Sequence, residues 1–459
     1  MPRSSNFMTF SVSIFIASCL LQLPQQAQAN ADAAQVSDAA KSSANRATVS
    51  AVAAQIRTQY FAKDKAEQVA GMLEQQAATG AFDGYSHGGD LATALTRQLQ
   101  PLDKHFAVQF RQTQLQPARS MNGPGISMAQ ELQRQNYGFK QLEILPGNIG
   151  YLRLDQFAEP AAEALQAADS ALGFLANTSA IIIDLRQNGG GAPGMVGYLV
   201  SAFTAKDAAI YNEFQQRQGT FSEAPARFYA KPRLDVPLFL LISGRSASAA
   251  EGFSYTLQAA KRTTVLGEAS AGAANPGGFF PAGEQFQVFV STGSPVNPIT
   301  QSNWEGSGVQ PDIQVTAEQA LEKAQLQALQ QLLANAPEHG LKQSWIWAAE
   351  LLQSPATPDE ATLAAYSGVY QDLTIRQSGQ GLTLQRGRRP LQYLQPLAEG
   401  QFAFKGNADV RLRFVREYNQ QIRALEIYTL AGTVQRFARS DTAGARPAAQ
   451  PDQRSGQGR

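Results

Sequence analysis

The sequence has few of the side chains that usually bind metal ions or form disulfides. Its 459 residues include one cysteine, Cys19, and three histidines, His87, His105 and His339. One cysteine supports neither an internal disulfide nor a thiolate cluster. Three scattered histidines also make a multi-histidine metal site hard to build. The sequence therefore predicts no metal and no cofactor, and it leaves catalysis to the oxygen atoms of Ser, Asp and Glu with one His.

The sequence also lacks an excess of charge of either sign. It has 38 basic and 37 acidic residues, which gives a formal net charge of +1. No overall field draws such a chain to nucleic acid or to an anionic membrane. The hydrophobic residues, 43% of the total, are enough for buried cores, and the length suggests two or three domains.

The first 29 residues have the pattern of an export signal. Arg3 supplies a basic start, residues 7–23 are mostly apolar, and Ala27-Gln28-Ala29 has the small-residue pattern that a signal peptidase recognises. We expect cleavage near Ala29 and a periplasmic or secreted mature protein. A rival interpretation is that residues 16–19, Ile-Ala-Ser-Cys, form a lipoprotein box that anchors the chain by lipid on Cys19. No later stretch has the apolar length of a membrane-spanning helix.

The rest of the chain divides by its hydrophobic periodicity. Residues 30–46 are small and polar and predict a flexible leader. Residues 47–104 have helical spacing and predict a small helical domain. Residues 105–354 alternate strand and helix signals, with buried strands at 180–184 and 237–242, and predict an α/β domain. Residues 355–359 read as a linker, residues 360–440 as a small antiparallel β meander or barrel, and residues 441–459 as a disordered tail.

Two loops of the α/β domain follow buried strands, where open α/β sheets bind ligands. The first contains Gly189, Gly190 and Gly191, whose amides can approach a developing oxyanion without a side chain in the way. A plain turn is the simpler explanation of a glycine run. The second loop contains Ser246 and Ser248 before a helix, which suits an exposed nucleophile. Helix capping is the commoner role of such a serine.

Five motifs, in this order along the chain, favour the catalytic interpretation of the two loops. They are residues 150–157 (GYLRLDQF), 183–190 (IDLRQNGG), 246–251 (SASAAE), 265–272 (VLGEASAG) and 308–312 (GVQPD). This series resembles the serine peptidase family of tricorn protease, the C-terminal processing peptidases and interphotoreceptor retinoid-binding protein, over about residues 48–334. The resemblance implies a ClpP/crotonase-like α/β catalytic domain. The helical segment of this chain before His105 is similar to the N-terminal helical bundle of the retinoid-binding-protein branch.

The resemblance assigns roles to individual residues. Ser248 corresponds to the nucleophile, and the amides of Ala249 and of Gly189 or Gly190 to the oxyanion hole. A Ser-Lys dyad is excluded because the loop at 269–275 (ASAGAAN) has no lysine. The tricorn-like branch uses a histidine instead, which matches His105. It also uses a carboxylate, for which Glu305 is expected.

The length of one segment also favours the tricorn-like branch. The stretch between residues 110 and 147 is too short for the PDZ domain of the processing peptidases.

The assignment of the base and of the function leaves alternatives. His87, in a glycine-rich loop, is the alternative base. We expect an exported serine peptidase that acts on a peptide or protein, with no nucleic-acid partner. The alternatives are an esterase, or an inactive relative that binds a hydrophobic ligand or peptide.

Overall fold

A computed structural model describes residues 23–111, 126–335, 340–353, 358–379, 381–417 and 421–440. The predicted lipid anchor at Cys19, most of the predicted linker and the predicted tail lie outside these residues. The chain forms two compact units. The first unit holds Met1–Gly125, Glu213–Ser222 and Asn275–Val296, and the second holds Ile126–Asn212, Glu223–Ala274 and Asn297–Arg459.

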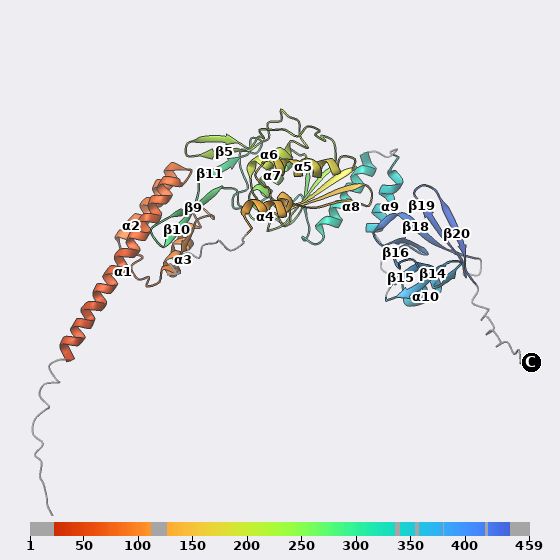
Figure 1. Cartoon of the computed structure of the whole chain (residues 1–459). Coiled ribbons are helices and arrows are strands. Elements are labelled where there is room, and N and C mark those ends of the chain that lie inside the picture. Colours follow the sequence, from red (N-terminus) through yellow and green to blue (C-terminus); the bar gives the residue numbers. More distant parts are fainter. Residues whose placement is uncertain are drawn as a thin grey trace, which may run out of the picture. The chain divides into compact units, whose positions relative to one another are not determined.

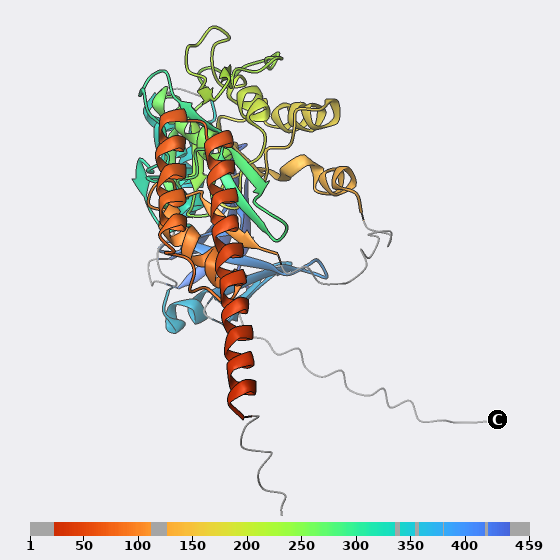
Figure 2. The same cartoon turned by 90° about the vertical axis from the view of Figure 1, so that its left-hand side faces the viewer.

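The first unit contains three helices, α1 (Leu23–Gln59), α2 (Lys63–Ala78) and α3 (Gly88–Leu99). Helices α1 and α2 run side by side (Figure 2). Their apolar residues at helical spacing, such as Val52, Ile56 and Leu73, are fully buried together with Leu95 of α3. The predicted helical domain is therefore present. Residues 30–46 belong to α1 rather than to a flexible leader, because their many alanines favour helix.

Strands from three parts of the chain complete the first unit. In one sheet, β10 (Phe286–Ser291) pairs with both β1 (Ala107–Phe110) and β9 (Gly277–Pro281). In another, β5 (Glu213–Gln216) pairs with both β6 (Gly219–Ser222) and β11 (Gly293–Val296). Val288 and Val290 of β10 are buried in the same core as the helices. The segments 213–222 and 275–296, which the sequence analysis included in the α/β domain, thus group with the helical unit.

A six-stranded sheet forms the centre of the second unit. Its order is β12-β8-β7-β4-β3-β2, in which β2 is antiparallel to β3 and the other neighbours are parallel. The strands are β2 (Phe139–Leu145), β3 (Ile149–Leu154), β4 (Ala180–Asp184), β7 (Leu238–Ile242), β8 (Thr264–Gly267) and β12 (Ile313–Gln314). Both predicted buried strands, β4 and β7, are buried at every position, because helices cover both faces.

The side chains of each central strand alternate between two cores. Ile181 and Ile183 of β4 pack in one core with α5 (Ala162–Phe174), α6 (Pro193–Val200) and α7 (Ala249–Ala259). Ile182 and Phe239 pack in the other with α8 (Ala320–Asn335) and α9 (Lys342–Leu352). Figure 1 shows α5–α7 and α8 on either side of the sheet. The short elements α4 (Met128–Arg134) and η1 (Asn136–Gly138) precede β2. The predicted α/β architecture is confirmed.

The C-terminal part of the second unit is an eight-stranded antiparallel sheet in sequential order, which confirms the predicted meander. Helix α10 (Glu360–Tyr366) precedes it. The strands are β13 (Gly368–Tyr370), β14 (Leu373–Ser378), β15 (Gly381–Arg386), β16 (Gln392–Ala398), β17 (Gln401–Phe404), β18 (Asn407–Arg416), β19 (Ile422–Thr429) and β20 (Val434–Ala438). Ala403 and Ala408 share the core of α8 and α9. Arg411 of β18 is buried over the Trp347 ring of α9. The meander therefore packs against α9.

The helices within the described residues include none that combines the length and the apolar character needed to cross a membrane.

Candidate active site

Ser248 lies immediately before α7, at the end of the loop that follows β7. Its φ angle is +53° with ψ of −115°, a conformation that residues with a side chain rarely adopt. Its side chain is exposed, whereas the following residues Ala249 and Ala250 are buried. A strained turn that presents a serine at the start of a helix is the geometry of a nucleophile elbow.

The carboxylate of Glu251 fixes this turn. Glu251 is fully buried in the first turn of α7, and its Oε2 accepts the Ser248 amide at 2.8 Å. Its two oxygens also accept the amides of Gly272 at 2.6 Å and Ala273 at 2.9 Å and the Ser270 hydroxyl at 2.6 Å. Four donors thus satisfy the two oxygens of this buried carboxyl group, as a buried polar group requires. Glu251 thereby ties the serine turn to the loop at 269–275.

The glycine turn lies directly beside Ser248. Gly190 has φ of +113°, and a Cβ atom there would lie 2.8 Å from Ser248 Cβ and 3.2 Å from the Ala249 nitrogen. Only glycine fits this close approach. The Gly190 amide donates to Asn188 Oδ1 at 2.8 Å, so one predicted oxyanion donor is already engaged. Within the described residues, the amides of Gly189 and Ala249 donate no hydrogen bond, which leaves these two as the candidate donors.

Asn188 holds the glycine turn against the serine loop. It is fully buried, and its Nδ2 donates to the Leu154 carbonyl at 3.0 Å. Its own carbonyl accepts the Ala247 amide at 3.1 Å. The side chain of Asn188 therefore links the end of β3 to the glycine turn, and its backbone carbonyl links that turn to the residue before Ser248.

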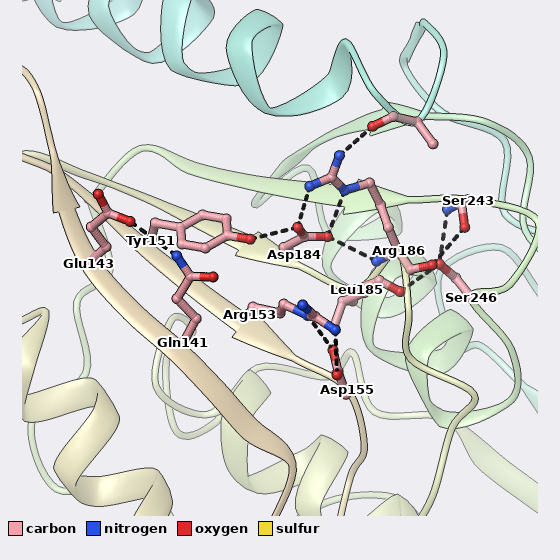
Figure 3. A network of polar contacts seen from close by, with 11 residues as sticks. Gln141, Glu143, Tyr151, Arg153, Asp155, Asp184, Leu185, Arg186, Ser243 and Ser246 are labelled. Carbon is pink, nitrogen blue, oxygen red and sulfur yellow. Dashed lines mark hydrogen bonds and ion pairs between the residues drawn. The ribbon is translucent and has the colours of Figure 1, made fainter. Parts of the chain in front are cut away.

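A network at the end of β4 anchors the same two loops (Figure 3). The buried Asp184 carboxylate accepts the Tyr151 hydroxyl at 2.8 Å and the Arg186 guanidinium. Burial by itself raises the pKa of Asp184, but the Arg186 contacts and the Tyr151 hydrogen bond lower it overall. The Ser243 hydroxyl then donates to the Arg186 carbonyl at 2.8 Å. The strand end and the loop after β7 thus form one hydrogen-bonded frame.

Ser246, the other serine of the loop, is part of this frame. It is fully buried, and its hydroxyl donates to the Leu185 carbonyl at 2.8 Å and accepts the Ser243 amide at 3.0 Å (Figure 3). A buried hydroxyl with both functions in use cannot attack a substrate. The exposed Ser248 is therefore the better nucleophile of the two.

Glu305 follows Trp304 in the loop before β12. Its Oε2 accepts the Ala274 amide at 2.9 Å, and the next residue, Gly306, donates to the Gly272 carbonyl at 2.9 Å. Trp304 is buried against α7, with its ring centroid 5.3 Å from that of Tyr255. The loop at 269–275, which has no lysine, therefore connects the Glu305 loop to Glu251 through backbone amides.

His105 belongs to the first unit, just before β1. Its Nδ1 lies 3.2 Å from Asp103 Oδ1, and its backbone amide donates to the same oxygen at 2.9 Å. The other oxygen of Asp103 accepts the Ser291 hydroxyl at 2.8 Å. The imidazole also stacks on Phe289. An Nδ1 proton directed at a carboxylate leaves the lone pair on Nε2, as a general base requires.

Asp103 is nine-tenths buried, and its environment favours the charged form. Burial by itself raises the pKa of this carboxyl, but the hydrogen bonds from His105 and Ser291 outweigh burial and lower the pKa to about 2. The alternative base, His87, has no such carboxylate among its described contacts: it is exposed at the start of α3, with its ring edge towards Phe110. The structure thus favours His105 over His87 as an oriented imidazole.

Comparison with known proteins finds similarity for the central part of the chain. Residues 148–315 match the family model described as peptidase family S41. This part of the chain is therefore similar to the S41 peptidases. The matched residues include Gly189, Ser248 and Glu305, whereas His105 precedes them.

Individual relatives cover only part of the chain. The carboxy-terminal-processing protease of Bartonella bacilliformis is 33% identical over 175 residues, which are 37% of this chain and 39% of that protein. The chain thus spans about two-fifths of the length of this curated relative. Among solved structures, a photosystem II D1 C-terminal processing protease is 23% identical with a TM-score of 0.32, covering 37% of this chain and 43% of that one. A lipoprotein from Streptococcus agalactiae is 14% identical with a TM-score of 0.41, covering 61% and 94%.

Three residues with roles around the site were not assigned from the sequence. Asn188 and Glu251 stand inside the segment that matches the S41 family model, but their positioning roles depend on contacts with loops far away in the chain. Asp103 stands two residues before His105, and that spacing is the signal that could have identified it as the partner of the imidazole.

Proposed function

We propose that this protein is a serine peptidase in which Ser248 is the nucleophile and His105 the general base. The observation that carries the proposal is the strained, exposed Ser248 at the start of α7, beside the Gly190 turn. A serine hydroxyl at ordinary pKa is a weak nucleophile and needs an adjacent base, which suits an imidazole oriented through Nδ1. The substrate class is a peptide or protein.

In the proposed reaction, Ser248 Oγ attacks the carbonyl carbon of the scissile bond while His105 Nε2 takes the hydroxyl proton. The amides of Gly189 and Ala249 donate to the oxyanion that forms. His105 then returns the proton to the leaving amine, and the acyl group stays on Ser248. A water molecule, activated by the same imidazole, releases the product by the reverse sequence of proton transfers.

The carboxylate partner of His105 has two candidates. Asp103 is supported by its 3.2 Å contact with Nδ1 within the first unit. Glu305 is supported by the resemblance that singled it out from the sequence. We assign the orienting role to Asp103 because a direct contact supports it, and we keep Glu305 as the alternative to be separated by mutation.

A fluorophosphonate probe tests the proposal, since only an activated serine reacts with such electrophiles at useful rates. We expect covalent labelling of the parent protein and none of Ser248→Ala. Ser302→Ala, which removes an exposed serine of the same unit, is the matched control and should label normally. Labelling that persists in Ser248→Ala would disprove the nucleophile. A peptide library read by mass spectrometry then distinguishes a peptidase from an esterase or an inactive binding protein.

Export is part of the proposal, with cleavage near Ala29 and a periplasmic or secreted mature protein. The apolar residues 7–23 and the Ala-Gln-Ala at 27–29 support it. Sequencing of the mature N-terminus tests it. A mature N-terminus at Asn30 would support simple cleavage after Ala29. A lipid-modified Cys19 at the N-terminus would instead support the lipoprotein alternative.

A further inference from the structure

The C-terminal sheet closes on itself into a barrel. The last strand, β20, is followed by Arg439, which forms an antiparallel bridge with Tyr370 of the first strand. The Ser440 amide donates to the Val369 carbonyl at 2.8 Å, and the Arg439 guanidinium donates to the Ser367 carbonyl at 2.7 Å. An eight-stranded antiparallel barrel is just wide enough either to be filled by its own side chains or to hold one small ligand.

One end of the barrel is filled. The Tyr366 ring of α10 stacks on Phe414 at 4.4 Å and meets Phe402 edge-on at 5.6 Å. Leu363, one turn earlier in α10, is also buried in the barrel core. Helix α10 therefore fills this end of the barrel with its side chains.

The opposite end of the barrel holds a cavity of about 300 Å³. Its apolar wall consists of Leu373, Leu384, Phe404 and Ile427. Leu373 and Leu384 are buried in the barrel core. Arg386 lies opposite Leu373 and Gln392 lies opposite Leu384, so these polar residues share the inward face and border the same cavity. The volume is at the lower limit for small-molecule sites, so it suits a short apolar chain.

The rim of this cavity is basic. Arg386 and Arg389 both line it, together with Gln392. Arg386 donates to Asp372 at 2.7 Å and lies over the Phe437 ring, which fixes its position. Within the described residues, Arg389 makes no ion pair, so the rim keeps an unmatched guanidinium. A planar guanidinium matches a carboxylate in geometry as well as charge.

We propose that the open end of this barrel binds a carboxylate carried on a short apolar chain. The apolar part occupies the cavity between Leu384, Phe404 and Ile427, and the carboxylate meets Arg389 at the rim. Two molecules carry this chemistry, a medium-chain fatty acid and the C-terminus of a peptide that ends in an apolar residue. The site is independent of Ser248 and of the proposed peptidase activity.

Displacement of a dansyl-labelled undecanoate from the full-length protein tests this site. We expect decanoate to displace the probe, and decanol to bind roughly tenfold or more weakly because it cannot form a charge-assisted contact. Arg389→Gln should weaken decanoate about tenfold and leave decanol unchanged. The matched control is Arg388→Gln, which removes the same charge from an exposed residue of the same turn that does not line the cavity.

Two further variants make the test specific. Gln392→Trp places a bulky ring at the exposed rim and should abolish binding of both decanoate and decanol. Ser248→Ala should bind decanoate like the parent, whether or not the protein is a peptidase. A peptide ending in leucine, as free acid and as amide, identifies the source: tighter binding of the peptide acid than of decanoate assigns the site to a peptide C-terminus.

Three results would overturn the proposal. The first is no displacement by decanoate. The second is equal affinity for decanoate and decanol, because Arg389 would then make no favourable contact with the carboxylate. The third is an equal loss of affinity in Arg388→Gln and Arg389→Gln, because that would reduce the effect to general charge rather than a site at the rim.

Discussion

The Ser248 amide donates to Glu251 Oε2 at 2.8 Å, so a residue in the first turn of α7 holds the backbone of the proposed nucleophile in its positive-φ conformation. The same carboxylate collects donors from the loop at 269–275. The shape of the turn therefore depends on a carboxyl group that is fully buried. Glu251 is a positioning residue.

Glu251→Gln should slow labelling of Ser248 by a fluorophosphonate about a hundredfold. The glutamine amide keeps one acceptor oxygen, but it replaces the other by an NH₂ group that faces backbone N–H donors. Hydrogen bonds that hold the turn are therefore lost, and the turn loses its fixed position. The apparent Km of a peptide substrate should change less than kcat. Glu163→Gln, at an exposed glutamate of the same unit, is the control and should label within twofold of the parent. Equal labelling of Glu251→Gln and the parent would contradict the positioning role.

Two neighbouring glycines give a matched pair of variants. Gly190→Ala should reduce labelling by at least tenfold, because its Cβ would lie 2.8 Å from Ser248 Cβ at a φ of +113°. Gly189→Ala should have little effect, since a Cβ there meets no atom within 4 Å and the amide proton is kept. Labelling rates and circular dichroism of both variants measure the difference. A stronger effect at Gly189 than at Gly190 would argue against the close contact with Ser248.

The carboxylate partner of His105 can be identified by comparing two substitutions. Asp103→Asn should lower kcat by roughly two to four orders of magnitude, the usual range for disturbed general base catalysis, and Glu305→Gln should lower it less. The amide can direct its NH₂ group at Nδ1 and favour the wrong tautomer. A pH profile of kcat/KM measures the acidic limb, which reports the general base, in each variant. The reverse order of effects would assign the role to Glu305.

Asp103 should also contribute to acid stability. Its pKa in the folded protein is about 2, below its ordinary value of 3.8, so the folded state favours the charged form. The resulting stabilisation, about 2 kcal/mol, is present above pH 4 and is lost as the pH falls towards 2. Asp103→Asn should therefore flatten the pH dependence of the unfolding free energy in this range. Urea denaturation at several pH values measures it, and an unchanged slope would contradict the assignment.

Glu223 should have the opposite pH dependence. It is buried beside Asn212, whose Nδ2 donates to it at 2.8 Å, and burial raises its pKa to about 8 from 4.5. The folded state favours the neutral acid, so the stabilisation is complete below pH 4.5 and is lost as the pH rises to 8. Glu223→Gln should have a higher Tm than the parent at pH 9 and a similar Tm at pH 4.5. Glu213→Gln, at an exposed glutamate, is the control, and an equal gain there would refute the explanation.

Local patterns in the sequence were enough to predict much of the fold. Continuous apolar runs predicted β4 and β7, because a strand covered on both faces has no polar side. Helical spacing predicted the N-terminal helices, and close alternation predicted the C-terminal meander. These elements depend on neighbours within a few residues of one another. Ser248 and the glycine turn were singled out by the family resemblance that the ordered motifs carry, before any contact was known.

Contacts between distant segments could not be predicted in this way. Strands β9 and β10 join β1 across more than a hundred and fifty residues, and nothing local in either segment specifies that pairing. The boundary expected near residue 355 likewise gave no sign that Ala403, Ala408 and Arg411 pack against α8 and α9. A chain cut there and separated from the meander would therefore expose part of the α9 surface.

The sequence by itself determined which residue types were available for chemistry, namely serine and carboxylates with few histidines and one cysteine, and it fixed the strands and helices that carry them. The tertiary structure alone decided that Ser246 is buried in the frame and that Ser248 is exposed, because burial depends on how the loop packs against the end of β4. It also placed Asn188 and Glu251 where they accept hydrogen bonds from the backbone of the Gly190 turn and the Ser248 turn. Hydrogen bonds between loops depend on where the strands of a folded sheet end, which no local pattern encodes.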